Sequence, residues 1–313
     1  MLGRLRLFRA MLVLAVSGWG TACAPIAVSR SAAATPEAPL ALADSHIDID
    51  DSARVDRVAP ARAPSSEKPT ARRQAPEVEW PIVYGRSVED RPLVAYRLGN
   101  GLIARALIGG LHGGYEWNST ALMSRTLEYL AAQPDRIPPE LTVYVIPLAN
   151  PDGAAAGSDR VQGRMNTRGV DLNRNWDYRW QMTATHGTRP VFAGTGAFSE
   201  PETALLRDFI LERDVEAAIF YHSAAGEVYS GADADTSHTV VLAKLVAAAT
   251  GYHYAPEGVP GQITTGNAID WLTQQGVTAI EVELSTHEAL DLERNLRGVA
   301  AFLSWNLPKS IVE

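Results

Sequence analysis

Cysteine is almost absent from this chain of 313 residues, which contains only Cys23. One cysteine cannot form a disulfide within the chain, so stability must come from a packed core, with or without a metal. Basic residues are also in deficit, because 28 Lys and Arg face 36 Asp and Glu, for a formal net charge of −8. Phosphate binding needs a basic face, so this balance argues against a nucleic-acid partner.

The N-terminus lacks an apolar run long enough to span a bilayer. Residues 1–22 instead have the layout of an export signal, with three arginines, the apolar stretch Met11–Val16 and then small residues. Cys23 falls where a bacterial lipoprotein carries its lipidated cysteine, after Gly20–Ala22. Three interpretations stay open: a lipid anchor, plain cleavage, or a cytosolic protein with an incidental hydrophobic start. We expect export to the periplasm, the cell envelope or the medium.

Residues 23–76 are rich in Ala, Pro, Ser and Arg and show little apolar periodicity. Such a segment cannot bury enough surface to offset the entropy of ordering, so we expect a disordered tether. The remaining residues, 77–313, are long enough for one folded domain. Overall, 46% hydrophobic and 20% charged residues describe an ordinary soluble globular protein.

Strand and helix patterns alternate through residues 77–313. We expect a turn and an antiparallel strand pair within 80–99, further strands at 102–108, 141–147, 215–221 and 277–284, and helices at 120–130, 199–211, 239–250, 267–275 and 290–305. Ser199 is expected to cap its helix, with Glu202 at the capping-box position. This order predicts an α/β fold: one domain with a mixed, mostly parallel twisted sheet covered by helices on both faces.

The segment Gly109–Asn118 follows a buried strand and places His112 and Glu116 close together. An imidazole and a carboxylate suit a zinc ion with an open position for water. A strand-to-helix turn with a hydrogen-bonded histidine explains the segment equally well. The rest of the chain must decide between the two.

Other polar groups follow later strands or lie in the long loop 154–198, which is dense in Arg, Asn and Trp. His222 and Glu283 come at strand ends, where sites gather in parallel sheets. Two histidines and a carboxylate make the ligand set of a hydrolytic zinc site, and a further carboxylate can act as general base. Arginine suits an oxyanion or a substrate carboxylate.

Several short motifs occur in a recognisable order. They are Gly85–Leu93, the His112 turn, Asn150–Gly153, Gly169–Asn175, Ser199–Thr203, Tyr221–Ser223, Ile269–Trp271 and Val282–Leu284. Each is weak alone, but together they resemble the zinc metallocarboxypeptidases related to carboxypeptidase A, from about Tyr84 to the last helix. Among these, small bacterial members such as the murein peptide amidases look most similar.

The resemblance implies one Zn²⁺ ion held by the side chains of His112, Glu116 and His222. It implies that the Asp171 carboxylate fixes the tautomer of the His112 ring. It also implies that Arg164 polarises the scissile carbonyl.

The resemblance also implies that Asn173 and Arg174 clamp the terminal carboxylate of the substrate. Glu283 matches the carboxylate that activates water and returns the proton to the leaving amine. Glu281, on the same strand face, is its rival.

Three positions depart from the family pattern. The family has His-x-x-Glu, whereas here Tyr115 occupies the expected slot and Glu116 comes one residue later. An extra glycine in the turn can absorb that shift. Gln262 stands where pancreatic-type members have a mobile tyrosine. Ile269, a substrate-pocket residue, stands where members specific for basic residues have an aspartate, so that position does not support a preference for terminal Lys or Arg.

We therefore expect a monomeric zinc carboxypeptidase that hydrolyses a peptide bond near a free C-terminal carboxylate. A narrower alternative is a murein peptide amidase that cleaves the γ-D-glutamyl–diaminopimelate bond of cell-wall peptides. Related deacylases of acylated amino acids fit less well, because the full carboxypeptidase-like loop is present. An inactive, surface-tethered peptide-binding module on the same fold is the non-enzyme alternative.

Overall fold

The computed structural model describes residues 79–231, 237–256 and 264–306. The expected export signal and tether, residues 1–76, lie outside these ranges, as does Gln262. Within the described ranges, no helix combines the length and the apolar character needed to cross a membrane.

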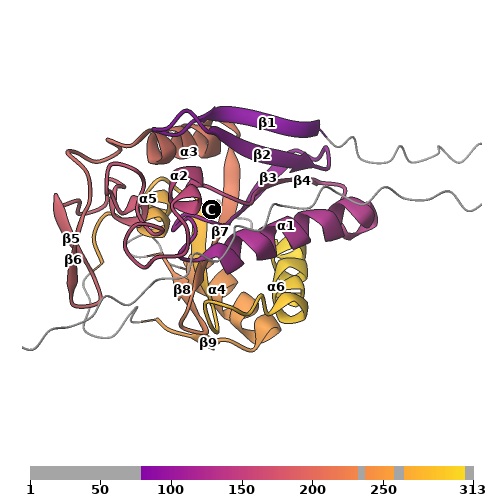
Figure 1. Ribbon diagram of the computed structural model, residues 1–313. Coiled ribbons are helices and arrows are strands. Elements are labelled where there is room, and N and C mark those ends of the chain that lie inside the picture. The colour runs from indigo at the N-terminus through magenta and orange to yellow at the C-terminus, as the bar shows by residue number, and fades with distance from the viewer. Residues whose placement is uncertain (1–78, 232–236, 257–263, 307–313) are drawn as a thin grey trace, which may run out of the picture. The chain divides into compact units, whose positions relative to one another are not determined.

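A sheet of eight strands forms the centre of the domain, in the order β1-β2-β4-β3-β7-β10-β8-β9 (Figure 1). The strands are β1 (Glu79–Arg86), β2 (Pro92–Leu98), β3 (Ile103–Ile108), β4 (Leu141–Ile146), β7 (Val215–Ser223), β8 (Glu227–Ser230), β9 (His253–Tyr254) and β10 (Thr278–Leu284). The central strands β4, β3, β7 and β10 are parallel, whereas β1, β2 and β8 pair antiparallel with their neighbours. The predicted mixed, mostly parallel sheet is confirmed.

Helices cover both faces of the sheet, as predicted. They are α1 (Trp117–Ala132), α2 (Pro151–Ala155), α3 (Pro201–Glu212), α4 (Ser237–Thr250), α5 (Ala268–Gln274) and α6 (Leu292–Ser304). Successive residues of β3 face opposite ways, so Leu107 belongs to the core under α1, α4 and α6, and Ile108 to the core under α3 and α5. Figure 1 shows α3 beside β1 and β2, with α4 and α6 on the far side of the sheet.

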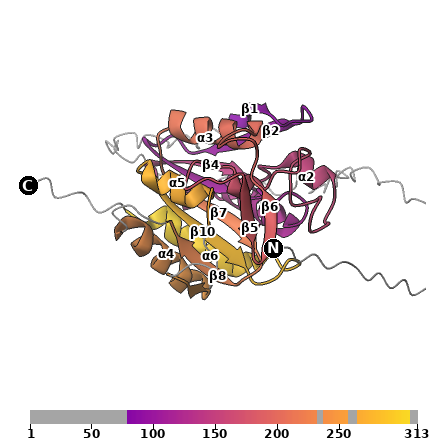
Figure 2. The ribbon, with the colours of Figure 1, turned by 90° about the vertical axis from the view of Figure 1, so that its left-hand side faces the viewer.

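The long loop contains structure that its sequence pattern did not predict. A hairpin of β5 (Thr183–His186) and β6 (Arg189–Phe192) projects from it, and a short 3-10 turn, η2, spans Leu172–Arg174. The hairpin lies at the left of Figure 1 and faces the reader in Figure 2. Strands β8 and β9 also went unpredicted. All four are too short to show the alternation that identifies a strand.

The predicted cap of α3 is wrong. The helix begins at Pro201, and its N-cap is Glu200, which makes no side-chain capping hydrogen bond. The Ser199 hydroxyl instead donates to the Glu200 carboxylate and accepts from the Asn175 amide. Hydrogen bonds to the polar groups at the start of α3 therefore hold the long loop against the domain.

Asp152 anchors the start of the long loop, although its sequence context indicated only a turn residue. The buried carboxylate accepts hydrogen bonds from Ser87 Oγ at 2.6 Å, Glu89 N at 3.0 Å and Arg91 Nη1 at 2.6 Å. Burial disfavours its charge, but these hydrogen bonds outweigh burial and lower the pKa of Asp152. The turn between β1 and β2 is thus tied to α2.

We expect Asp152→Ala to lower the free energy of unfolding by about 3 kcal/mol at pH 7, because the Ser87 hydroxyl and the Glu89 N–H lose their acceptor. Urea denaturation measures the change. Because the folded-state pKa of Asp152 is lowered, its contribution is lost as pH falls through that pKa, so the difference should shrink in acid. Glu128→Ala removes an exposed carboxylate of α1 and is the control. An equal loss in both variants would contradict this anchor.

Candidate metal centre and substrate cavity

The parallel strands bring the candidate residues to one edge of the sheet. His112 comes shortly after the end of β3, and His222 is near the end of β7. Glu283 is the register partner of His222 on the adjacent strand β10. Because parallel strands end at the same edge, groups that are up to 171 positions apart in the sequence face one cavity there.

The turn from His112 to Glu116 accommodates the extra residue of this chain. Gly113 has φ +49°, and a side chain on it would collide with the backbone of Gly153 and Gly163. A Cβ on Gly114 would lie 2.2 Å from the carbonyl oxygen of Gly157. The Glu116 N–H donates to the His112 carbonyl at 3.4 Å. The turn therefore brings the side chains of His112 and Glu116 close together. The expectation that an extra glycine absorbs the shift agrees with this geometry.

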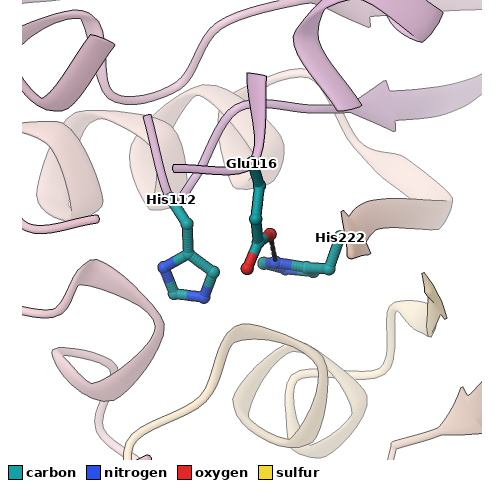
Figure 3. Close-up of side chains that lie close together, drawn as sticks. All are labelled: His112, Glu116 and His222. Carbon is teal, nitrogen blue, oxygen red and sulfur yellow. Dashed lines mark hydrogen bonds and ion pairs between the residues drawn. The ribbon is translucent and has the colours of Figure 1, made fainter. Parts of the chain in front are cut away.

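His112, Glu116 and His222 form a compact buried group (Figure 3). One possible ligand atom from each lies within 4.8 Å of the other two. Glu116 Oε2 is 2.9 Å from His222 Nδ1, and the two imidazole centroids are 4.8 Å apart. Figure 3 shows the three side chains converging on one point from three sides.

The chemistry of this group fits zinc. Two imidazoles and one carboxylate are the ligands that zinc takes in hydrolytic sites. His112 Nδ1 and His222 Nε2 are buried without a hydrogen-bond partner, which is costly for a structural histidine and ordinary for a ligand. Burial, followed by the charge of Arg164, lowers the pKa of His112 well below its usual value, so its imidazole is in the neutral form that binds metals.

Carboxylates dominate the environment of His222. Burial alone would lower its pKa, but Glu281 and Glu116 outweigh burial and raise the pKa of His222 to about 9. Before a metal binds, the imidazole therefore carries a proton that balances the nearby carboxylates. A metal ion must displace that proton.

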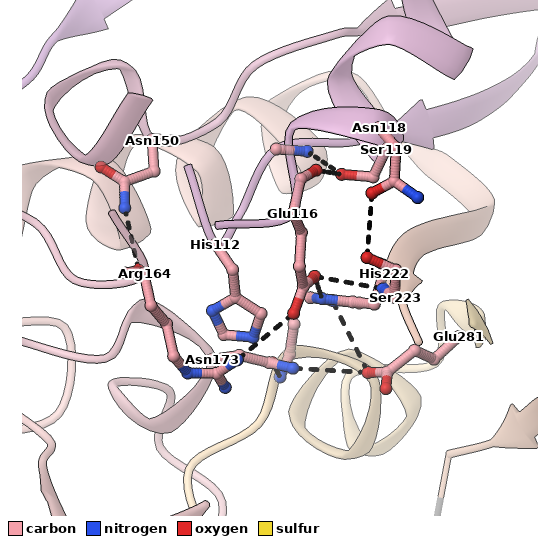
Figure 4. A network of polar contacts seen from close by, with 12 residues as sticks. His112, Glu116, Asn118, Ser119, Asn150, Arg164, Asn173, His222, Ser223 and Glu281 are labelled. Atoms are coloured by element: carbon pink, nitrogen blue, oxygen red, sulfur yellow. Dashed lines mark hydrogen bonds and ion pairs between the residues drawn. The ribbon is translucent and has the colours of Figure 1, made fainter. Parts of the chain in front are cut away.

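Arg164 links Glu116 to Asp171, and Figure 4 shows its side chain beside those of His112 and Glu116. Arg164 Nε donates to Asp171 Oδ2 at 2.9 Å, and Arg164 Nη1 donates to Glu116 Oε1 at 3.3 Å. Burial opposes the charge of Arg164, but Asp171 and Glu116 outweigh it and raise the pKa. Asp171 Oδ1 is 3.7 Å from His112 Nδ1, beyond hydrogen-bond range, so the expected direct bond to the histidine is absent from this geometry.

Glu281 and Glu283 both face the cavity from β10, as their spacing predicts. Burial, then the charges of Glu116 and Glu281, raises the pKa of Glu283 well above its usual range. Among the residues that the structure describes, Glu283 Oε2 has no hydrogen-bond partner. Glu281 Oε2, in contrast, accepts from Asn173 Nδ2 at 3.3 Å and lies 3.7 Å from His222 Nε2. The two carboxylates therefore differ in environment although they share a strand face.

Asn173 and Arg174 are held by the backbone around them. Asn173 Oδ1 accepts from the N–H of Ala268 at 3.0 Å, which ties η2 to α5. Arg174 donates through Nε to the Thr185 carbonyl at 2.9 Å and through Nη1 to the Asn173 carbonyl at 2.6 Å. The guanidinium is thus fixed in place at the wall of the cavity.

All the predicted site residues except Asp171 line one cavity of about 600 Å³. Asp171 is fully buried behind it. The sequence reasoning did not assign His186, His287 or Tyr229 to the site, yet all three line the cavity. The histidines had no partner pattern along the chain, and Tyr229 belongs to the unpredicted strand β8. Only the tertiary fold brings them here.

Comparison with known proteins agrees with this geometry. A family model described as zinc carboxypeptidase matches residues 70–293, well over half of the chain. The chain belongs to the zinc carboxypeptidase family. Zinc is accordingly the cofactor expected of the chain, and His112, Glu116 and His222 are a group in the described ranges that could hold it.

Curated relatives match part of the chain. Zinc carboxypeptidase A 1 of Anopheles gambiae is 34% identical over 157 residues, which are 44% of this chain and 36% of that protein. Carboxypeptidase B of Astacus astacus is 30% identical over 159 residues, 44% of this chain and 52% of that protein. The chain thus spans about half or less of the length of these relatives.

Solved structures share the fold. Bovine thrombin-activatable fibrinolysis inhibitor, in complex with tick carboxypeptidase inhibitor, superimposes with a TM-score of 0.64 at 20% identity over 72% of this chain and 89% of that chain. Murein-tripeptide amidase MpaA from Escherichia coli O157 gives 0.55 at 24% identity over 77% of this chain and 98% of that chain.

We expect the purified protein to carry one zinc ion per chain, and His112→Ala and His222→Ala each to abolish stoichiometric zinc after dialysis, because two ligands hold the ion poorly. Elemental analysis measures the content. His253→Ala, at a side chain 74% exposed, should keep its zinc. Full zinc content in both cavity variants would show that the ion is held elsewhere.

Proposed function

We propose that this chain is a zinc-dependent carboxypeptidase that hydrolyses a peptide bond near a free C-terminal carboxylate. One observation carries the proposal: a single cavity joins the buried His112, Glu116 and His222 group to an unpaired carboxylate oxygen of Glu283 and to the fixed guanidinium of Arg174. The chemistry that zinc supplies when bound is polarisation of a carbonyl and a lower pKa for water.

Glu283 is the general base in this proposal. Burial, and then the charges of Glu116 and Glu281, raise its pKa and so make it a stronger base, which suits a group that takes a proton from water and passes it to the leaving amine. The Oε2 atom of Glu283 can accept that proton, because no described residue forms a hydrogen bond with it. Glu281 is the weaker candidate, because its carboxylate is already bonded to the Asn173 amide.

Arginines hold the substrate in this proposal. The buried, charged Arg164 stabilises the negative oxygen that develops on the scissile carbonyl. Arg174, fixed by two backbone carbonyls, binds the terminal carboxylate with Asn173 beside it. Asp171 holds Arg164 in position by accepting its hydrogen bond, and Arg164 in turn donates to Glu116. Asp171 acts in this way and not by a direct hydrogen bond to His112.

A murein peptide amidase is the second candidate. It is supported by the match to the Escherichia coli amidase, which extends over 98% of that chain, and by the export-like N-terminus. We propose that the protein is exported and works as a monomer, with a lipid anchor at Cys23 or without one. Comparing a murein tripeptide with ordinary C-terminal dipeptide units as substrates separates the two candidates.

We expect Glu283→Gln to lower kcat by at least about a hundredfold on short peptides while zinc stays bound, because the proton acceptor is lost and the metal ligands remain. Steady-state kinetics and elemental analysis measure both quantities. Glu288→Gln, at an exposed position just beyond β10, is the matched control. Near wild-type turnover of Glu283→Gln would refute its role. Peptide binding without turnover in the wild-type protein would favour an inactive binding module.

Wild-type protein should prefer a free C-terminal acid over the corresponding amide by about 10- to 100-fold in kcat/KM, because only the acid pairs with the Arg174 guanidinium. Arg174→Met should bring that ratio close to one, whereas Arg160→Met, an exposed arginine of the same loop, should leave it unchanged. An acid-to-amide ratio that survives in Arg174→Met would place the carboxylate clamp on another side chain.

A further inference from the structure

A series of hydrogen bonds runs from α1 to the wall of the cavity. Asn118, near the start of α1, is completely buried, and its Nδ2 donates to the backbone carbonyls of Thr286 at 2.7 Å and Ala289 at 2.9 Å. Carbonyl oxygens can only accept, so they fix which side of the amide carries the hydrogens. The Oδ1 atom of Asn118 is therefore an acceptor, and Ser223 Oγ donates to it at 2.9 Å (Figure 4).

This series fixes the tautomer of His287. Ser223 Oγ is 2.9 Å from His287 Nδ1, and a serine hydroxyl has a single hydrogen, which it donates to Asn118. Ser223 Oγ must therefore accept from His287, so the hydrogen of the neutral ring is on Nδ1. Nε2 is then an acceptor, and no described residue forms a hydrogen bond with it. For the same reason Ser223 is not arranged as a nucleophile with His287 as its base.

The ring of His287 is held at the cavity wall by its neighbours. Tyr115 packs against it, with ring centroids 4.5 Å apart and an interplanar angle of 48°. Thr286 Oγ1 accepts from the N–H groups of Glu288 at 3.2 Å and Ala289 at 2.9 Å, which closes the turn that carries the histidine. Both Tyr115 and His287 line the cavity. Tyr115 occupies the slot of the family's glutamate, so this contact depends on the departure of the chain from the family pattern.

Ser223, and His287 with it, lies on the opposite side of Glu116 from Arg164. Glu116 Oε1 accepts from Arg164, whereas Glu116 Oε2 accepts from the Ser223 N–H at 3.3 Å. Figure 4 shows Arg164 and Ser223 on opposite sides of Glu116. Arg164 belongs to the long loop, which also carries Arg174. A substrate with its terminal carboxylate at Arg174 and its scissile carbonyl at the metal centre therefore extends its acyl part toward Ser223 and His287.

We propose that His287 is a substrate-binding residue whose Nε2 accepts an amide N–H from the acyl part of the substrate, the part that precedes the scissile bond. Ser223 and Asn118 are positioning residues, because they set the tautomer of His287. This inference rests on the proposed carboxypeptidase function and names its substrate class. The class is acyl chains that present an amide N–H, since an ester oxygen facing Nε2 would leave two acceptors without a donor.

The test compares acetyl-Ala-Ala-Phe with two analogues, in each of which one alanine N–H is replaced by an ester oxygen. In the wild type one of these replacements should lower kcat/KM by about 10-fold, because the hydrogen bond to Nε2 is lost. In His287→Phe, which keeps an aromatic ring beside Tyr115, the same replacement should change kcat/KM by less than about twofold. His253→Phe, at a side chain 74% exposed, is the matched control and should keep the wild-type effect. Zinc content checks that each variant is folded.

A second measurement determines the tautomer without turnover. Nitrogen NMR of the zinc-loaded wild type in mildly alkaline buffer should show the His287 hydrogen on Nδ1, and Ser223→Ala should give a mixture of tautomers. A wild-type ring with its hydrogen on Nε2, or an unchanged tautomer in Ser223→Ala, would overturn the inference.

The kinetic test can also overturn it. If neither ester replacement lowers the wild-type kcat/KM, or if the loss persists in His287→Phe, His287 does not bind the acyl part. If no peptide is cleaved, the proposed function fails, but binding still decides. Calorimetry with zinc-loaded wild-type protein should show acetyl-Ala-Ala-Phe binding about 10-fold more tightly than one ester analogue, and His287→Phe should remove the difference.

Discussion

Close approach of backbone to backbone is the constraint on which this site depends. At Gly113 and Gly114 the turn after β3 presses against the backbone of the long loop, with no space for side chains. That contact brings the loop over the strand edge, and with it Arg164 and Asp171. It also reverses the chain so that Glu116 reaches the same point as His112. The His112, Glu116 and His222 group and the arginine side of the cavity thus depend on the same contact.

Much of the fold follows from local patterns. The buried runs of β3, β4, β7 and β10 and the apolar spacing of the main helices indicate an α/β sheet covered on both faces, and the structure has it. Burial drives these long elements, so their sequences carry the signal. The hairpin β5–β6 and the strands β8 and β9 have no more than four residues each, and tertiary contacts alone determine them.

The site could be predicted where a residue able to bind a metal or transfer a proton lies at the end of a predicted strand. His112 follows a strand, and His222 and Glu283 lie at the ends of theirs, so their convergence could be expected from a parallel sheet. The partners of Asp152 could not, because a hydrogen bond between residues 65 positions apart leaves no local pattern. For the same reason the sequence showed Glu281 only as a rival base, and its distance from Asn173 and position opposite Tyr229 needed the fold.

The shared strand face of Glu281 and Glu283 couples the protonation of one carboxylate to that of the other. Each carboxylate lies in the electric field of the other, and the charge of Glu281 contributes to the raised pKa of Glu283. A cation that neutralises Glu281 would therefore make Glu283 more acidic. A substitution that removes the charge at position 281 would therefore lower the pKa of Glu283 without changing any residue of the His112, Glu116 and His222 group.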